Sequence, residues 1–305
     1  MTAIDLLVIG DCNPDLVLRG ENVEPTFGQV ERVVERAELT VGGSATITAC
    51  GAARLGLRTA LAAVVGDDVL GRFMLDELEE RGVDVSGVLV DSGVATGVSV
   101  VLVKGGDRAT LTALGSISTL VPHQVDRTLL RAARHVHVSS FFLQHALRPD
   151  LPALLREARA TGASTSLDPN WDPAGAWDGD LGAALAQTEV LLLNDEEARR
   201  ISGVEDVEGA ARALARDGAT VVLKRGSHGA LAVERDSLVH AAARPVDAVD
   251  SVGAGDSFNA GFIVGFLGGR PLAETLALAN ACGSLSMRAA GGTAAQATLA
   301  EAFAE

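Results

Sequence analysis

A glycine-rich stretch that leads into a helix is the part of this sequence best suited to chemistry. Asp250-Ser251-Val252-Gly253-Ala254-Gly255-Asp256 precedes apolar residues at helical spacing, namely Phe258, Phe262, Ile263, Phe266 and Leu267. Glycines at the start of a helix let backbone N–H groups converge where the helix dipole adds partial positive charge. Asp256, in the first turn, could accept the proton of an attacking hydroxyl. The stretch therefore predicts phosphoryl transfer to an alcohol.

The same stretch has a purely structural interpretation. Gly-Ala-Gly before a helix often forms only a tight turn, and the helix dipole alone favours an aspartate in the first turn. Residue types and spacing leave both interpretations open.

The first predicted strand, Leu6 to Ile9, ends beside polar residues. Asn13-Pro14-Asp15 follows it, at the strand end where open α/β sheets bind ligands. The Asp15 carboxylate could accept hydrogen bonds from two sugar hydroxyls. An ordinary Asx-Pro turn would use the same residues, so local chemistry does not separate the two interpretations.

A run of small residues then opens a tightly packed helix. Gly42-Gly43-Ser44 forms the loop before this helix, which contains Thr46 and Thr48 and ends at Gly56. Glycines in such a loop would let the backbone approach a ligand closely.

Strands and helices alternate over the rest of the chain, which predicts a doubly wound, mostly parallel sheet flanked by helices. The apolar runs that indicate later strands are 136–138, 164–167, 190–193 and 220–223. Two extended runs around Gly105-Gly106-Asp107-Arg108 predict a hairpin, either at the edge of the main sheet or joined with 17–39 in a small separate sheet. We expect one domain over 1–305, with a small sheet built from about 13–40 and 95–115.

Polar clusters follow three of these later strands. They are Asp168-Pro169-Asn170-Trp171-Asp172, Asn194-Asp195-Glu196-Glu197 and Lys224-Arg225-Gly226-Ser227-His228-Gly229. The second cluster also fits an ordinary helix start, with Asn194 as the cap and acidic residues in the first turn. That interpretation and a ligand-binding one stay open.

Composition limits the class of protein. The chain has 305 residues, 48% hydrophobic and 21% charged, which is typical of a globular protein. Its net charge of −15 argues against nucleic-acid and anionic-membrane partners. Three separated cysteines indicate neither a zinc site nor a disulfide framework, and they fit a reducing compartment. With no leader pattern and no apolar run of membrane-spanning length, we expect a soluble cytoplasmic protein.

Taken in order, these motifs resemble those of the ribokinase-like (PfkB) carbohydrate kinases over nearly the whole chain. The stretch from Asp250 to Asp256 is similar to the signature of that family. The resemblance implies a ribokinase-like fold whose small sheet is a lid over the sugar and, in relatives, often a homodimer interface. It implies ATP-dependent phosphorylation of a sugar hydroxyl, which we expect to be primary. Asp256 would be the base, and the N–H groups of Gly253, Ala254, Gly255 and Asp256 would form the anion hole.

The resemblance also assigns ligand contacts. The sugar would be held by Asn13, Asp15, Gly42, Gly43, Ser44, Thr48 and Asp256. ATP would be held by Asn194, Lys224, Gly226, Gly229, Gly255 and Asn280. Mg²⁺ would lie near Asn194 and Glu197, and because it keeps several waters, Glu197 would act through water. In many relatives a monovalent cation lies near the residue at Asp250, which makes K⁺ a further candidate.

Two positions depart from the family pattern. Ile47 stands where the family usually has an asparagine that binds sugar hydroxyls, with Thr46 and Thr48 as the nearest substitutes. Asp172 stands where the family has an arginine, which favours a neutral sugar over an anionic one.

Two alternative functions remain. The first is a nucleoside kinase of the same fold, but only 3% of residues are aromatic and none is tyrosine, which disfavours stacking of a base. The second is a non-catalytic sugar-sensing protein, which Ile47 favours and the intact Asp256 disfavours.

Overall fold

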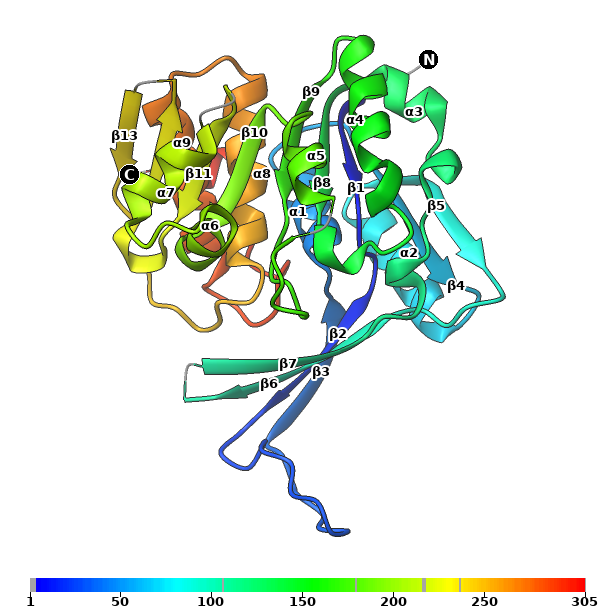
Figure 1. The fold of residues 1–305 in the computed structure, drawn as a ribbon. Helices are drawn as coiled ribbons and strands as arrows, with labels where there is room; N and C mark the ends of the chain where they lie inside the picture. Colours follow the sequence, from blue (N-terminus) through cyan, green and yellow to red (C-terminus); the bar gives the residue numbers. More distant parts are fainter. Residues whose placement is uncertain (1–3, 106, 179, 216–217, 236, 305) are drawn as a thin grey trace.

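The computed structural model describes residues 4–105, 107–178, 180–215, 218–235 and 237–304. The strands within them are β1 (Ile4–Ile9), β2 (Pro14–Arg19), β3 (Arg36–Val41), β4 (Thr59–Gly66), β5 (Asp84–Asp91), β6 (Val98–Lys104), β7 (Asp107–Ala113), β8 (Ala133–Ser139), β9 (Ser164–Asp168), β10 (Val190–Asn194), β11 (Thr220–Lys224), β12 (Ala230–Glu234) and β13 (Ser237–Ala241). Over these ranges they form a nine-stranded central sheet and a separate four-stranded small sheet (Figure 1). The predicted fold is confirmed.

The central sheet is mostly parallel, with the order β13-β12-β11-β10-β9-β8-β1-β4-β5. β12 pairs antiparallel with both β11 and β13, while the other neighbours run parallel. β1 is buried along its whole length, as a central parallel strand covered on both faces requires. Its side chains alternate between two apolar clusters, one on each face of the sheet.

Helices cover both faces of this sheet (Figure 1). They are α1 (Ser44–Arg54), α2 (Val69–Glu80), α3 (Arg127–Ala132), α4 (Leu151–Ala160), α5 (Leu181–Leu185), α6 (Asp195–Ser202), α7 (Val207–Leu214), α8 (Ala254–Leu267), α9 (Leu272–Ser286) and α10 (Leu299–Phe303). Apolar side chains of α1, α2, α8, α9 and α10 pack on one face, and those of α3 to α7 pack on the other. None of the helices in the described ranges is long and apolar enough to cross a membrane.

The order of the strands locates the crevice in which ligands are expected. From β1, the chain adds β4 and β5 on one side and β8 to β11 on the other. The carboxyl ends of β1 and β8 therefore border the switch point, where open α/β sheets bind their ligands. β1 is followed after four residues by β2 of the small sheet, which projects from this edge of the molecule (Figure 1).

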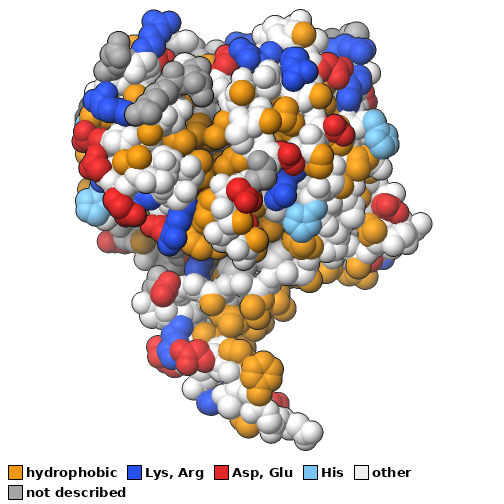
Figure 2. Space-filling model, in the orientation of Figure 1, with side chains coloured by type: hydrophobic (Ala, Val, Ile, Leu, Met, Phe, Trp, Pro, Cys, Tyr) orange, Lys and Arg blue, Asp and Glu red, His pale blue; other side chains and the backbone are white. Residues whose placement is uncertain are grey.

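The small sheet has the order β3-β2-β6-β7, and it contains the predicted hairpin as β6 and β7. Its strands fall at 14–19, 36–41, 98–104 and 107–113, and Gly106 of the predicted turn lies outside the described residues. β7 is exposed along its whole length. Figure 2 shows hydrophobic side chains gathered over the projecting part of the molecule, and Phe27 and Val33 of the β2–β3 connection are 97% and 80% exposed.

Candidate active site

Helix α8 begins at the predicted position, with its N-terminus open to an anion. Gly253 is the N-cap with φ 71°, a left-handed conformation that suits glycine, and a Cβ there would lie 2.7 Å from Cα of Gly292. The N–H groups of Gly255 and Asp256 donate to no acceptor among the described residues, as expected of a first helical turn. Together with the helix dipole, they make a site for negative charge.

Asp256 stands in this first turn with the properties of a base. It is half-buried, and its Oδ1 accepts a hydrogen bond from the Ser44 hydroxyl. The pKa of Asp256 is raised to about 7. Burial is the largest cause of this raised pKa and the charges of Asp168 and Asp11 act in the same direction, while the Ser44 hydrogen bond and the Lys224 charge partly oppose them. A carboxylate with a pKa near neutrality is well matched to accepting a proton from an alcohol.

Lys224, at the end of β11, adds a positive charge to the same place. Its Cδ and Nζ lie 3.6 Å from where a Cβ of Gly255 would stand. Its ammonium is paired with the fully buried carboxylate of Asp168, which also accepts a hydrogen bond of 2.7 Å from Asn259 Nδ2. Burial alone would lower the pKa of Lys224, but the carboxylates of Asp168 and Glu197 outweigh it and raise that pKa. The ammonium is therefore held charged.

The residues predicted to hold the sugar gather around the loop before α1. A Cβ at Gly42 would collide with the Asp15 carboxylate, so only glycine fits there. Gly43, with φ 77°, is the N-cap of α1, and a Cβ on it would lie 3.0 Å from Oδ1 of Asn13. The pKa of Asp15 is raised to about 7, mainly by burial and also by the charges of Asp11 and Asp256. Asp15 and Asp256 thus belong to one cluster of carboxylates.

Asp11 positions this loop, and the sequence analysis did not identify it. Its two carboxylate oxygens accept the N–H groups of Ser44 and Ala45, both at 2.9 Å, and so cap α1. Because Ser44 also donates to Asp256, this cap fixes the partner of the predicted base. The feature of the sequence that could have identified Asp11 is its position directly after a buried strand and Gly10.

The threonines beside Ile47 do not replace the missing asparagine. Thr46 donates to the Gly42 carbonyl, and the completely buried Thr48 donates to the Asp256 carbonyl at 3.4 Å. Ile47 is 3% exposed and packs against Gly292. The structure therefore corrects the expectation for Thr48, which supports α8 and presents no surface to a sugar.

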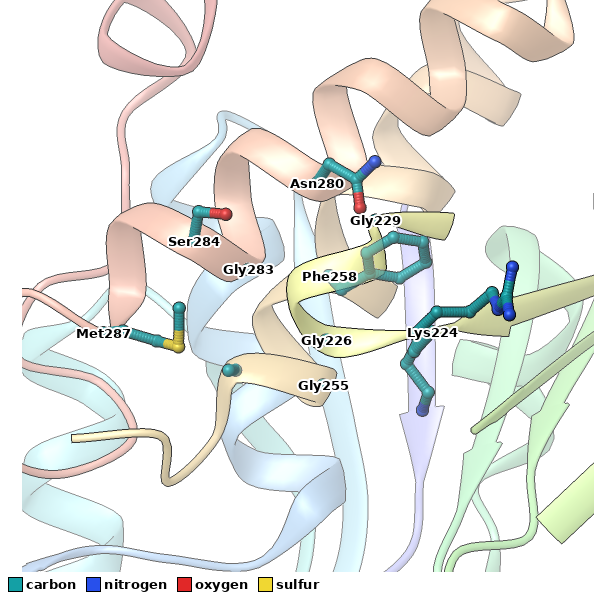
Figure 3. Close-up of a pocket in the computed structure, with 11 residues that line it drawn as sticks. Lys224, Gly226, Gly229, Gly255, Phe258, Asn280, Gly283, Ser284 and Met287 are labelled. Carbon is teal, nitrogen blue, oxygen red and sulfur yellow. The ribbon is translucent and has the colours of Figure 1, made fainter. Parts of the chain in front are cut away.

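A cavity between the loop after β11 and α9 brings together most of the residues predicted to contact ATP (Figure 3). It is lined by Lys224, Gly226, Gly229, Gly255 and Asn280, together with Phe258, Ser284 and Met287. Asn280, Ser284 and Met287 project to one side of α9 and its end (Figure 3). Nδ2 of Asn280 donates to the carbonyls of Ala241 and Ala242, both at 3.0 Å, and so fixes this wall.

Asn194 does not line that cavity and caps α6 instead. Its Oδ1 accepts the Glu197 N–H at 2.8 Å, and its own N–H donates to Oε2 of Glu197 at 2.8 Å. This reciprocal capping confirms the structural interpretation of the cluster. The pKa of Glu197 is raised to about 7, mainly by burial and also by the charge of Asp168. Oε1 of Glu197 accepts no hydrogen bond from the described residues, so it remains available.

The carboxylate of Asp250 is already neutralised. It is paired with Arg19 of β2 and accepts the N–H groups of Val252 at 3.0 Å and Gly291 at 2.9 Å. Arg108 of β7 contacts the Ser251 hydroxyl at 3.4 Å. Two arginines therefore connect the small sheet to the loop that precedes α8.

The carboxylate of Asp172 is turned into its own loop. It is 5% exposed and accepts the N–H groups of Ala174 at 2.9 Å and Trp177 at 2.7 Å. Its hydrogen bonds are made within the loop, so this carboxylate is not directed at a ligand.

Comparisons with known proteins identify the family of the chain. The model of the pfkB family carbohydrate kinases matches residues 3–299. The chain is 34% identical to an ATP-dependent ribose-1-phosphate kinase of Halopiger xanaduensis, over 93% of this chain and 92% of that protein. It is 35% identical to a fructokinase of Klebsiella pneumoniae, over 93% of each chain.

The fold also matches a putative ribokinase II of E. coli solved with ATP and Mg²⁺. The TM-score is 0.87 at 24% identity, over 98% of this chain and 97% of that one. With the near-complete family match, these similarities show an ATP-dependent sugar kinase, and the chain belongs to the pfkB family of carbohydrate kinases.

Proposed function

We propose that this protein transfers the γ-phosphoryl group of ATP to a hydroxyl, expected to be primary, of a small sugar, with Asp256 as the general base. One observation carries the proposal. The Asp256 carboxylate and the unpaired N–H groups of Gly255 and Asp256 share the first turn of α8, and the Lys224 ammonium lies beside them. The base, the anion site and the positive charge therefore all lie within reach of a single phosphoryl group.

In the proposed reaction, the chain positions the acceptor and stabilises charge. Asp15 and the backbone at Gly42 and Gly43 orient the sugar, and Ser44 orients Asp256 through its hydrogen bond. Asp256 accepts the hydroxyl proton as the oxygen attacks the γ-phosphorus, and the bond from that phosphorus to the bridging oxygen breaks to release ADP. The N–H groups at the start of α8 then stabilise the charge on the phosphoryl oxygens. Positioning and electrostatics supply most of the catalysis in phosphoryl transfer, and the small sheet would act as a lid that excludes water.

The donor set near Glu197 fits a magnesium ion held through water. Mg²⁺ bound with ATP would neutralise charge on the phosphates. Within the described residues no group of three or more His, Cys, Asp or Glu side chains forms a metal cage. Oε1 of Glu197 is nevertheless available, while Asn194 holds the other oxygen in place. Glu197 would therefore meet the ion through its waters, in keeping with the partial hydration of protein-bound Mg²⁺.

The surroundings of Asp250 do not fit a monovalent cation bound by its carboxylate. Arg19 already supplies a positive charge there, and two backbone N–H groups fill the remaining positions. A cation at this place would be held instead by backbone carbonyl oxygens near Asp250 and in 289–292, and the comparison of turnover with and without K⁺ tests for it.

The test is ADP release from Mg-ATP against neutral sugars, sugar phosphates, sugar acids and nucleosides, with and without K⁺. Turnover on a sugar should fall by about two to four orders of magnitude in Asp256→Asn, the usual scale for losing a general base. Near-normal turnover of that variant would remove Asp256 from this role. Turnover of nucleosides alone would indicate a nucleoside kinase, and sugar binding without ADP release would indicate a sensor.

A further inference from the structure

A second cavity, of about 840 Å³, lies between the small sheet and the loops that follow β8 and β9. This volume is in the range of small-molecule sites. The residues that line it include Thr110 and Thr112 of β7, His145 and Arg148 after β8, and Asn170 and Asp172 after β9. None of these belongs to the ATP-side cavity described above.

Arg148 is a cation in this cavity without a protein counter-ion. Among the described residues it forms no ion pair, and its buried Nε has no hydrogen-bond partner. Its guanidinium stacks over Phe141 at 5.5 Å from the ring centroid and makes one long contact, of 3.5 Å, from Nη1 to the Phe142 carbonyl. By contrast, Lys224 and Arg225 are each paired with an aspartate. Because a partly buried charge without a partner is costly, Arg148 is suited to an anionic ligand.

The other groups that line the cavity are compatible with an anion. Its one lining carboxylate, Asp172, is directed to the N–H groups of Ala174 and Trp177. Asn170 accepts the Ser140 N–H at 2.8 Å through Oδ1, while its Nδ2 donates to no described residue. The cavity wall therefore offers more donors than acceptors.

The cavity is connected to the residues that would hold the sugar. The Thr112 hydroxyl lies 3.0 Å from Ser99 Oγ, and Asn13 Nδ2 donates to the same oxygen at 3.4 Å. Ser99 lies opposite Asp15 in the pairing of β2 with β6. A sugar bound at Asp15 could thus extend a substituent past Thr112 toward Arg148.

Resting on the proposed function, we infer that the acceptor is an anionic sugar whose phosphate or carboxylate group is bound by Arg148. The hydroxyl to be phosphorylated faces Asp256, and the anionic group occupies the cavity at the opposite end of the sugar. Arg148 is then a specificity-determining residue. This replaces the expectation of a neutral sugar, which rested on Asp172.

The experiment measures kcat/KM for matched acceptors that differ in charge: ribose against ribose 1-phosphate, fructose against fructose 1-phosphate, and 3-deoxyfructose against 2-dehydro-3-deoxygluconate. The phosphate and carboxylate arms separate the two sources of negative charge. The anionic member of at least one pair should be favoured by about 100-fold or more, since a desolvated charge pair contributes on this scale. Arg148→Met should reduce that ratio by about 100-fold, and Arg148→Lys should restore part of it. Arg156→Met, on the exposed face of α4, is the matched control and should leave the ratio unchanged.

Each outcome decides one of the two claims. Equal use of neutral and anionic sugars, or a charge preference that survives in Arg148→Met, would overturn the inference and leave the kinase proposal standing. If no sugar yields ADP, the proposed function fails. Sugar binding measured by calorimetry in the absence of ATP then tests the inference about Arg148 by itself. Ribose 1-phosphate or 2-dehydro-3-deoxygluconate should then bind the wild type and lose that binding in Arg148→Met. If neither compound binds the wild type, the inference about Arg148 is refuted.

Discussion

The two ends of the crevice are built differently. At the proposed phosphoryl-transfer end, Lys224 and Asn259 both bond to the carboxylate of Asp168, and Glu197 is hydrogen-bonded to the cap residue of α6. At the acceptor end, the cavity is bounded by the wholly exposed β7 and contains Arg148, which has no counter-ion among the described residues. At the first end the charges of Lys224 and Asp168 satisfy each other, whereas at the second end the charge of Arg148 is left for a ligand.

This difference separates reaction from specificity. A residue whose partners are buried protein groups cannot change without disturbing the fold, so the transfer end tolerates little variation. Residues on loops and at an exposed strand can change at smaller cost, so the acceptor can differ between proteins with the same reaction. The two similar relatives, a ribose-1-phosphate kinase and a fructokinase, differ in this way.

The largest effect is expected from a negative charge at the start of α8. In Gly255→Asp the new carboxylate would stand beside Lys224 and occupy the anion site, so turnover should fall by about 10³-fold or more. The fold should survive, because an aspartate near a helix N-terminus is favourable. Steady-state kinetics and thermal unfolding measure the two effects.

The matched control is Gly255→Ala. A Cβ there meets Lys224 at 3.6 Å, an ordinary contact, so turnover should stay within about tenfold of the wild type. Equal losses in the two variants would show that the glycine matters for shape and not for charge.

The next effect tests whether the transfer end is internally satisfied. Asp168→Asn leaves the Lys224 ammonium without its buried partner, and the free energy of unfolding should fall by about 3 kcal/mol. The double variant Asp168→Asn/Lys224→Met should recover part of that loss, because no charge is then left unpaired. Urea denaturation of the wild type, the two single variants and the double variant measures the coupling energy between the two side chains. Additive losses would contradict a direct interaction between the two side chains.

Local signals in the sequence were sufficient for the framework. The start of α8, the loop at Gly42 and Gly43, and the β6–β7 hairpin all follow from contiguous residues, so periodicity and glycine positions predicted them. The role proposed for the stretch from Asp250 to Asp256 needed the family resemblance as well, because its residue types and spacing also fit a simple tight turn.

Contacts between distant residues could not be predicted. Asp168 and Lys224 end β9 and β11, which are separated by β10, so their meeting depends on the order and register of the sheet. Arg148 has no motif around it, and its relevance comes from the cavity that the small sheet closes. The sequence shows the residue type of Asp172 but not that its carboxylate is hydrogen-bonded within its own loop.

A smaller effect concerns the pH dependence of the transfer end. Burial places the pKa of Asp256 at about 7, so kcat/KM should rise with pH through this range as the base ionises. The positive charge of Lys224 lowers that pKa, so Lys224→Met should move the rise to higher pH. If the pKa of Asp256 rises by one unit, kcat/KM at pH 6 falls by about tenfold, in addition to any loss that does not depend on pH. Lys224→Arg, which keeps the charge, should leave the midpoint in place, and an unmoved midpoint in Lys224→Met would exclude this coupling.

The smallest effect on turnover is expected where the acceptor end is most exposed, in the small sheet and its β2–β3 connection. Phe27, Val33 and Leu111 are 97%, 80% and 61% exposed, and burying such side chains against a second copy would stabilise a homodimer. Phe27→Ser should weaken the dimer by about tenfold or more, as loss of a central aromatic contact does. Turnover should stay within about twofold, because Phe27 touches none of the proposed site residues. Light scattering over a concentration series, with Val90→Ser on β5 as the control, measures the dissociation. A monomeric wild type at all concentrations would reject the dimer, and the exposed apolar side chains would then need another partner.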